Sequence, residues 1–313
     1  MRTAYTESAF FFIQRSIGDR LIVEAGYNST FGHRLTRAYR VERGRVDLPA
    51  NDRRSSDEET ISIASDGNSS YHSLQVRVTS RERRRVTFQA HYTLSKSIDT
   101  ASADRPSMFR ALGLGPVDEN NASLERGPSD FDRRHRAVGF FVWRGPSFHG
   151  SKEPWLGNWQ FSGIVTLESG PHVSVYSSGD FFGRLGDFNH DGVLNDRVAY
   201  IGPGSLQSSL HKNASPADRY FDANLFAAPG VRGGEPLGRN VLPSPGYASI
   251  DLSIQKKFSL TEIQKIEVRA DVFNAANRVN FAAPVTDLVS ADFGRSVEAG
   301  RARIVRFVLK YSF

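Results

Sequence analysis

Cysteine is absent from the 313 residues, and so is any apolar run of about 18 residues, the length that a membrane-spanning helix needs. The missing cysteine fits an oxidising compartment that tolerates no stray thiol, but equally chance, so it decides nothing by itself. The missing apolar run excludes a transmembrane helix. It does not exclude a membrane protein, because the strands of a barrel need only about ten residues each and half of those face a polar lumen.

Two further signals are missing from the sequence. The apolar run 9–13 is too short for a secretory signal peptide, and Gln-Arg-Ser follows it instead of small residues at a cleavage site. The net charge of +6 permits nucleic-acid binding, but the basic residues are scattered or cluster in apparent loops (DRRHR, RERRR). We therefore expect no nucleic-acid partner, and a basic surface that faces solvent or lipopolysaccharide.

Helical periodicity is also nearly missing, and alternation with a period of two takes its place. In the segment 86–95, Val, Phe, Ala, Tyr and Leu alternate with Thr, Gln, His, Thr and Ser. Segments around 74–78, 159–168, 249–255 and 266–272 repeat the pattern. We predict nine strands: 9–17, 20–30, 71–81, 84–96, 135–143, 159–169, 247–258, 264–273 and 303–313. Residues 172–178 are interpreted as the strand 159–169 bending into the loop that follows it.

The connections between these strands fall into two classes that alternate along the chain. Short turns follow the segments ending near 17, 80 and 258, and a medium segment spans 145–158. Long segments rich in Gly, Ser, Asn, Asp and Arg cover 31–70, 97–134, 170–246 and 274–302. If the chain changes sides at each strand, every long segment lies on one side. This asymmetry is typical of outer-membrane barrels, with short periplasmic turns and long extracellular loops.

Aromatic residues agree with that topology. It places Trp143, Trp159 and Phe258 near the short-turn rim, with Phe313, and it places Tyr92 and Tyr247 near the opposite rim. Rings at both water–lipid boundaries form the girdles of such barrels. The last strand ends on an aromatic ring and resembles the C-terminal signal that hands bacterial outer-membrane proteins to the barrel-assembly machinery. The matching positions are Val305, Phe307, Leu309, Tyr311 and Phe313.

Several longer stretches resemble the Oar-like TonB-dependent receptors, and together they cover nearly the whole chain. They are LSKSIDTASADR (94–105), ERGPSDFDRRHR (125–136), GNWQFSGIVTLESG (157–170), GRNVLPSPGYASIDLSIQKKF (238–258), VRADVFNAANRVNF (268–281) and the C-terminal strand. The resemblance implies an outer-membrane receptor with a regulatory-like domain, a plug and a barrel of about 22 strands. It also implies that the TonB system would act through an N-terminal part that precedes this sequence.

The fold class we expect is therefore all-β: residues 1–313 form an antiparallel transmembrane β-barrel in part, with about nine to ten long strands of a larger barrel. An odd strand number departs from the even numbers of bacterial single-chain barrels. We accordingly expect Met1 to lie in mid-barrel, on the extracellular side, and a chain that does not transport its unknown large solute alone. The partners implied are outer-membrane lipid, lipopolysaccharide, the assembly machinery and TonB, in the bacterial outer membrane.

One motif in the third long segment points to a metal. In DFNHDGVLND, the residues Asp187, Asn189, Asp191 and Gly192 match the start of a calcium loop, in which alternate oxygens converge. The closing Glu is replaced by Val198, and Asp196 is the nearest substitute. The motif has two interpretations: a Ca²⁺ site, or a turn rich in Asp, Asn and Gly that binds no metal. No other cofactor is expected.

The alternation also assigns a polar lumen face, and it leaves two alternative functions open. The lumen set is Gln75, Arg77, Gln89, His91, Thr93, Glu168, Asp251, Gln255, Glu267, Arg269, Asp271, Arg306 and Lys310. A self-contained barrel acting as a surface protease would use acids and a histidine in its outer loops, with Asp130, Asp132 and His135 as the natural candidates. An adhesin would use the same loops for binding. We expect the protein to have no enzymatic activity.

Overall fold

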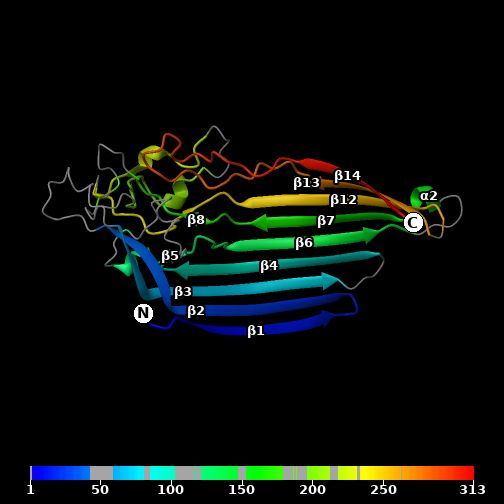
Figure 1. Cartoon of the computed structure of the whole chain (residues 1–313), viewed down its shortest axis with the longest axis horizontal. Coiled ribbons are helices and arrows are strands. Elements are labelled where there is room, and N and C mark those ends of the chain that lie inside the picture. The colour runs from blue at the N-terminus through cyan, green and yellow to red at the C-terminus, as the bar shows by residue number, and fades with distance from the viewer. Residues whose placement is uncertain are drawn as a thin grey trace.

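The structure, a computed structural model, consists of one long curved sheet with a layer of loops at one end. It describes residues 2–42, 59–80, 85–102, 117, 121–146, 153–178, 186, 188, 196–211, 218–230, 233–261 and 263–313. Figure 1 shows the long strands side by side, the loops gathered at one end, and the C-terminus at the other end beside the short helix α2 (Glu153–Leu156). We call these the long-loop end and the short-turn end.

In the part of the chain that the structure describes, nine long strands follow one another as an antiparallel meander, and nine is the number predicted. The order β1-β2-β3-β4-β6-β7-β12-β13-β14 keeps every sequence neighbour adjacent in the sheet, while β5 (Gly127–Pro128) pairs with the end of β4. The strands are β1 (Tyr5–Ile17), β2 (Leu21–Glu42), β3 (Glu59–Ser80), β4 (Val86–Asp99), β6 (His135–Arg144), β7 (Trp159–Glu168), β12 (Tyr247–Ser259), β13 (Lys265–Phe273) and β14 (Ile304–Ser312).

The alternation of residue types produces two chemically distinct faces. Residues directly opposite in an antiparallel pair share a face of the sheet. Tyr27 lies opposite Leu74, Leu74 opposite Leu94, and Val78 opposite Ala90, which builds a continuous apolar face. On the other face Glu24 lies opposite Arg77, which lies opposite His91. We call these the apolar face and the polar face.

The prediction of a long loop over residues 31–70 is wrong at both ends of that segment. β2 continues to Glu42 and β3 starts at Glu59, so that most of this segment is paired strand. A β-bulge between Gly32 and Thr36, with Arg34 at φ 54°, shifts the register and hides the strand continuation from a search for strict alternation. Beyond the bulge, Arg37 forms a two-bonded ion pair with Asp66 at 2.8 and 2.7 Å.

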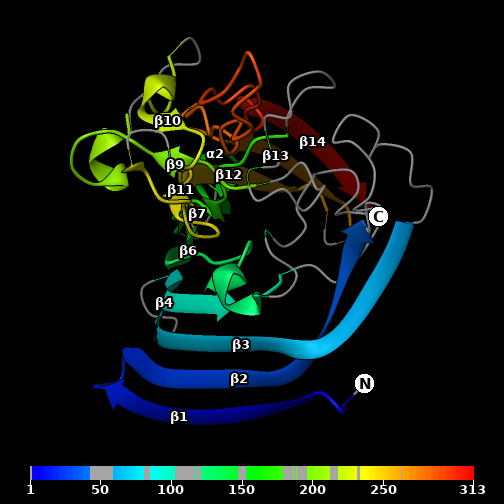
Figure 2. The ribbon, with the colours of Figure 1, turned by 90° about the vertical axis from the view of Figure 1, so that its left-hand side faces the viewer.

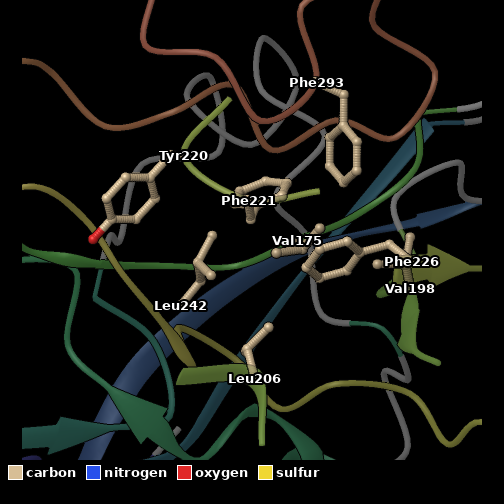
Figure 3. Packing of buried hydrophobic residues seen from close by; sticks show 8 residues of the cluster. All are labelled: Val175, Val198, Leu206, Tyr220, Phe221, Phe226, Leu242 and Phe293. Carbon is tan, nitrogen blue, oxygen red and sulfur yellow. The ribbon is translucent and has the colours of Figure 1, made fainter. Parts of the chain in front are cut away.

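The two C-terminal long segments are not the structureless loops expected from their composition. They fold together around a buried cluster of Val175, Val198, Leu206, Tyr220, Phe221, Phe226, Leu242 and Phe293 (Figure 3). The three phenylalanine rings meet with centroids 4.9–5.5 Å apart, and each buried ring contributes about 2 kcal/mol. Because Phe293 comes from the segment 274–302, the cluster joins both segments into one layer.

Short pairings complete this loop layer. β8 (His172–Val173) pairs with β11 (Leu242–Pro243), and β9 (Ala199–Tyr200) pairs with β10 (Phe226–Ala227). Among the described residues, the short 3₁₀ helix η2 (Ala122–Glu125) precedes β5, whereas η4 (Leu206–Ser209) and η5 (Ala223–Leu225) lie between β9 and β10 in the chain. We expected residues 172–178 to continue β7, and this is wrong. His172 and Val173 pair with β11 instead, and Tyr176 forms bridges to Arg197 and Asp287.

The sheet curls without closing on itself (Figure 2). In the described part of the chain, the outer edges of β1 and β14 have no strand partner. Since the number of antiparallel strands between these edges is odd, β1 and β14 run in the same direction, from the long-loop end to the short-turn end. None of the helices among the described residues is long and apolar enough to span a membrane.

Candidate functional site: the polar face and the loop layer

The predicted lumen residues do share one face. The register sets Gln75 opposite Thr93, Gln255 opposite Arg269, and Glu267 opposite Lys310. Their charges are paired across strands: Arg77 Nε lies 2.9 Å from Glu24 Oε2, and Arg136 Nε lies 2.7 Å from Glu168 Oε1. These pairs are exposed, so each contributes less than about 1 kcal/mol. These ion pairs make the face hydrophilic and place positive and negative side chains next to one another across the strands.

Asp271 is a buried acid on the polar face. Its carboxylate accepts hydrogen bonds from Arg306 Nη2 at 2.8 Å and from Ser253 Oγ at 2.7 Å. Arg269 Nε lies 3.3 Å from the same carboxylate. The cluster links β12, β13 and β14, so it fixes the last strand to its neighbours through side chains as well as through the backbone ladder.

Arg239 holds the loop layer to the end of the sheet. Its guanidinium forms an ion pair with Asp99 at the end of β4, and it donates to the backbone carbonyls of Asp99 (2.8 Å), Glu125 (2.7 Å) and Gly127 (3.3 Å). Arg239 and Asp99 are both nine-tenths or more buried. A Cβ on Gly127 would lie 2.3 Å from the Arg239 carbonyl oxygen, so this close approach requires glycine.

A second buried arginine repeats the arrangement nearby. Arg197 forms an ion pair with Glu125 at 2.8 Å and donates to the carbonyls of Leu124 and Leu237, both at 2.8 Å. Removing one partner of such a buried pair costs about 3–5 kcal/mol, because the other charge stays buried. Asn240 has a positive φ of 53°. Its side-chain amide Nδ2 donates hydrogen bonds to Pro128 O at 2.8 Å and to Asp130 Oδ1 at 2.6 Å. We call Asp99, Glu125, Arg197, Arg239 and Asn240 the loop clamp.

The three protease candidates are each bound to a different partner. Asp130 accepts from Asn240, as above, and His135 Nδ1 bonds the Tyr92 hydroxyl at 2.7 Å on the apolar face. Asp132 accepts from the Ser97 backbone N–H at 2.7 Å, and its other oxygen lies 3.7 Å from His172 Nδ1. Burial lowers the pKa of His172, although the nearby Asp132 charge acts to raise it. The nearest histidine partner of Asp132 is thus His172, which the sequence did not single out.

The predicted calcium loop is described only in part. Asp187, Asn189 and Asp191 lie outside the described residues, whereas Asp196 is buried, and its Oδ2 accepts from the Phe188 backbone N–H at 2.6 Å. Among the residues that the structure describes, no group of three His, Cys, Asp or Glu side chains is placed to hold a metal. Calcium binding by this loop stays a prediction.

The residues of the predicted assembly signal lie in line on the apolar face of the edge strand β14. Val305, Phe307, Leu309, Tyr311 and Phe313 expose between 50% and 89% of their surface. The first four lie opposite Val272, Ala270, Val268 and Ile266 of β13, and Phe313 directly follows β14. The stacked rings of Tyr311 and Phe313 end the strand at the short-turn end. Their part in assembly stays a prediction.

Comparison with known proteins decides the family. The family model described as outer membrane beta barrel domain matches residues 1–306. The chain belongs to this family. The structure also resembles that of the outer membrane transporter YddB from Escherichia coli, with a TM-score of 0.51 and 12% sequence identity. That likeness covers 99% of this chain but 32% of the transporter, so the chain spans about a third of its length. No curated protein sequence matches the chain.

Membership of the outer membrane beta barrel domain family orients the molecule. The chain resides in the bacterial outer membrane, its apolar face meets lipid, and its polar face lines the lumen. Trp143 lies opposite Phe161, and Phe258 opposite Ile266, in a row at the short-turn end. Tyr92 lies at the other level, on the lipid face. Tyr247 reaches that level too, but its register opposite Glu168 places it on the polar face, where it is no part of a lipid-facing girdle.

Proposed function

We propose that the chain is the C-terminal portion of the barrel of a TonB-dependent transporter for a large solute, with a complete barrel of about 22 strands. The observation that carries the proposal is the pair of open edges. Lipid offers no hydrogen-bond partner to an exposed backbone edge, so both edges need strands beside them. Because β1 and β14 run in the same direction, they cannot close on each other as an antiparallel pair. The remainder of the barrel therefore supplies an odd number of strands.

Transport would depend on parts outside this sequence. In the proposed assembly, a plug fills the lumen against the polar face, and TonB delivers energy through the N-terminal part. The barrel-assembly machinery inserts the chain by its last strand. Alone, the chain would neither close nor transport. The coverage of about a third of YddB, which is described as an outer membrane transporter, supports this assignment. We propose no catalytic role for the loop layer, since Asp130, Asp132 and His135 have separate partners.

Closure can be tested by cross-linking, because these 313 residues contribute no cysteine besides those introduced. Ser16 and Ser312 lie at the short-turn ends of β1 and β14, and both are replaced by cysteine in the protein as it occurs in outer membranes. A matched control carries S162C and S253C, which the register places directly opposite on β7 and β12. After mild oxidation we expect an intramolecular disulfide in the control and none between positions 16 and 312. Efficient linking of 16 to 312 would mean that the nine strands close by themselves, and the proposal would fail.

A further inference from the structure

The lipid face carries a cluster of basic and aromatic side chains that the transport proposal does not use. It lies at the long-loop end of β2, β3 and β4, and it consists of Tyr27, Phe31, His33, His72, Lys96 and Arg126. We call it the outer-rim patch. The Tyr27 hydroxyl bonds His72 Nδ1 at 2.7 Å, and the Phe31 and His72 rings meet edge to face at 5.3 Å. Since Tyr27 lies opposite Leu74, these rings continue the apolar face.

The register places the two long cations on the same face. Lys96 lies directly opposite His72. Gly127 lies opposite Asp99, which is bound to Arg239 on the polar side, so the preceding Arg126 points the other way. Arg126 then lines an open hollow of about 410 Å³ together with Phe31, His33, Asn68, Ser69 and His72. The hollow is a concave site with rings on its walls and a guanidinium at its edge.

The height of the patch matches the headgroup level of the membrane. Val86 lies opposite Trp143 at the short-turn rim, and Lys96 follows ten residues later on the same strand. Ten residues of strand span about 33 Å, which at the usual tilt of about 40° is about 25 Å along the membrane normal. That distance is the height of the apolar band of such barrels, so Lys96 and its neighbours lie where the outer-leaflet headgroups begin.

The charges of the patch are available for a ligand. Arg126 and Lys96 are exposed, and within the described residues neither side chain has an ion-pair or hydrogen-bond partner. Arg34, the next cation, lies over the ring of Tyr5 at 5.8 Å. Glu7 lies directly opposite Phe31, so it is an acid on the same face. An anion at the hollow would therefore meet the guanidinium of Arg126 at its edge, with Lys96 beside the lining residue His72 on the neighbouring strand and Glu7 opposite Phe31.

We propose that the outer-rim patch is a binding site for the phosphorylated headgroup of lipopolysaccharide in the outer leaflet. A guanidinium binds phosphate oxygens in a two-bonded fork, and an ammonium adds a point charge. The acyl chains of the same lipid would lie along the apolar face below Tyr27 and Leu74. A soluble anion would satisfy the cations but would leave these apolar walls without a partner, which favours the lipid. The inference rests on the outer-membrane location and not on the transport proposal, so a failed uptake assay leaves it standing.

The test uses the protein purified in folded form from outer membranes and native mass spectrometry with added lipid A. The double variant K96Q/R126Q is compared with R303Q/K310Q, which removes the same charge from exposed positions away from the patch. We expect K96Q/R126Q to retain about tenfold less bisphosphorylated lipid A, because charge-assisted bonds to phosphate are lost, and the control to retain it as the parent does. Heat-modifiability on gels verifies that both variants fold.

Two further arms separate the sources of binding. Lipid A stripped of its phosphates should bind the parent protein about as weakly as bisphosphorylated lipid A binds K96Q/R126Q, and E7Q should bind bisphosphorylated lipid A more tightly than the parent. Inorganic phosphate at millimolar concentration should not displace the lipid. Equal retention by parent and K96Q/R126Q overturns the proposal, as does equal binding of the stripped lipid. Displacement by inorganic phosphate would overturn the lipid assignment in favour of a soluble anion.

Discussion

Replacing Arg239 by glutamine should detach the loop layer from the sheet while leaving the sheet intact. The substitution removes the ion pair to Asp99 and the bonds to the carbonyls of Glu125 and Gly127. Asp99 would remain buried with Ser102 Oγ, at 2.8 Å, as its nearest hydrogen-bond donor. An uncompensated buried charge of this kind costs about 3–5 kcal/mol. That cost is a large part of the 5–15 kcal/mol or so that stabilises a typical domain, so it should appear as local opening.

Hydrogen exchange measured peptide by peptide is the assay. In R239Q, amides of the segments 121–130 and 233–246 should exchange about a hundredfold to a thousandfold faster, whereas amides of β7 and β12 keep their protection. The matched control is R306Q, which removes a 56% exposed arginine but leaves Asp271 its partners Ser253 and Arg269, so it should cost less than R239Q does. Adding D99N to R239Q should recover part of the protection, because it removes the stranded charge.

The result that would refute this reasoning is equally specific. If the segments 121–130 and 233–246 exchange at the same rate in R239Q and in the parent protein, the buried arginine does not hold the layer. An equal change in R306Q would show that the effect is one of net charge and not of burial. R239K is informative as well: lysine keeps the charge but lacks the fork, so it should recover little.

Three other predictions concern pH, assembly and calcium. Burial lowers the pKa of His172 in the folded protein, so the unfolded state takes up the proton first, and the loop layer should lose stability as the pH falls below about 6.5; H172Q should flatten that dependence in a pH series of exchange or proteolysis rates, and an unchanged slope would contradict it. Replacing Phe313 by alanine should lower the folded protein recovered in outer membranes several-fold, judged by heat-modifiability, whereas S312A should not. Calcium should protect the 186–196 region from proteolysis in the parent protein and not in a D187N/D191N variant; isothermal titration without calcium heat would remove the idea.

The strands were predictable because lipid imposes a strict rule on sequence. Where one face must be apolar and the other wet, residues such as Val86, Phe88 and Tyr92 have to alternate with Thr87 and Gln89, and period two becomes visible. Beyond the headgroups that rule ends. β2 and β3 continue past Gly32 beyond a bulge that shifts the register, so strict alternation is interrupted in the sequence although the backbone ladder persists.

The loop layer was not predictable for a different reason. Its contacts join residues far apart in the chain: Arg239 meets Asp99 across 140 positions, and Arg197 meets Glu125 across 72. No local pattern distinguishes these arginines from the solvated ones in DRRHR. The same limit applies to Asp132, for which sequence proximity favoured His135, whereas the fold brings His172 nearer and turns His135 to Tyr92 on the lipid face.

The most direct test of the central claim is the size of the folded protein in native outer membranes. An immunoblot with an antibody against the loop segment 233–246 compares boiled and unboiled samples. We expect a band at about three times the 34.8 kDa of this chain, since the chain corresponds to 32% of the transporter that it resembles. A folded species of about 35 kDa that migrates faster when unboiled would show that nine strands suffice for a barrel, and it would contradict the account.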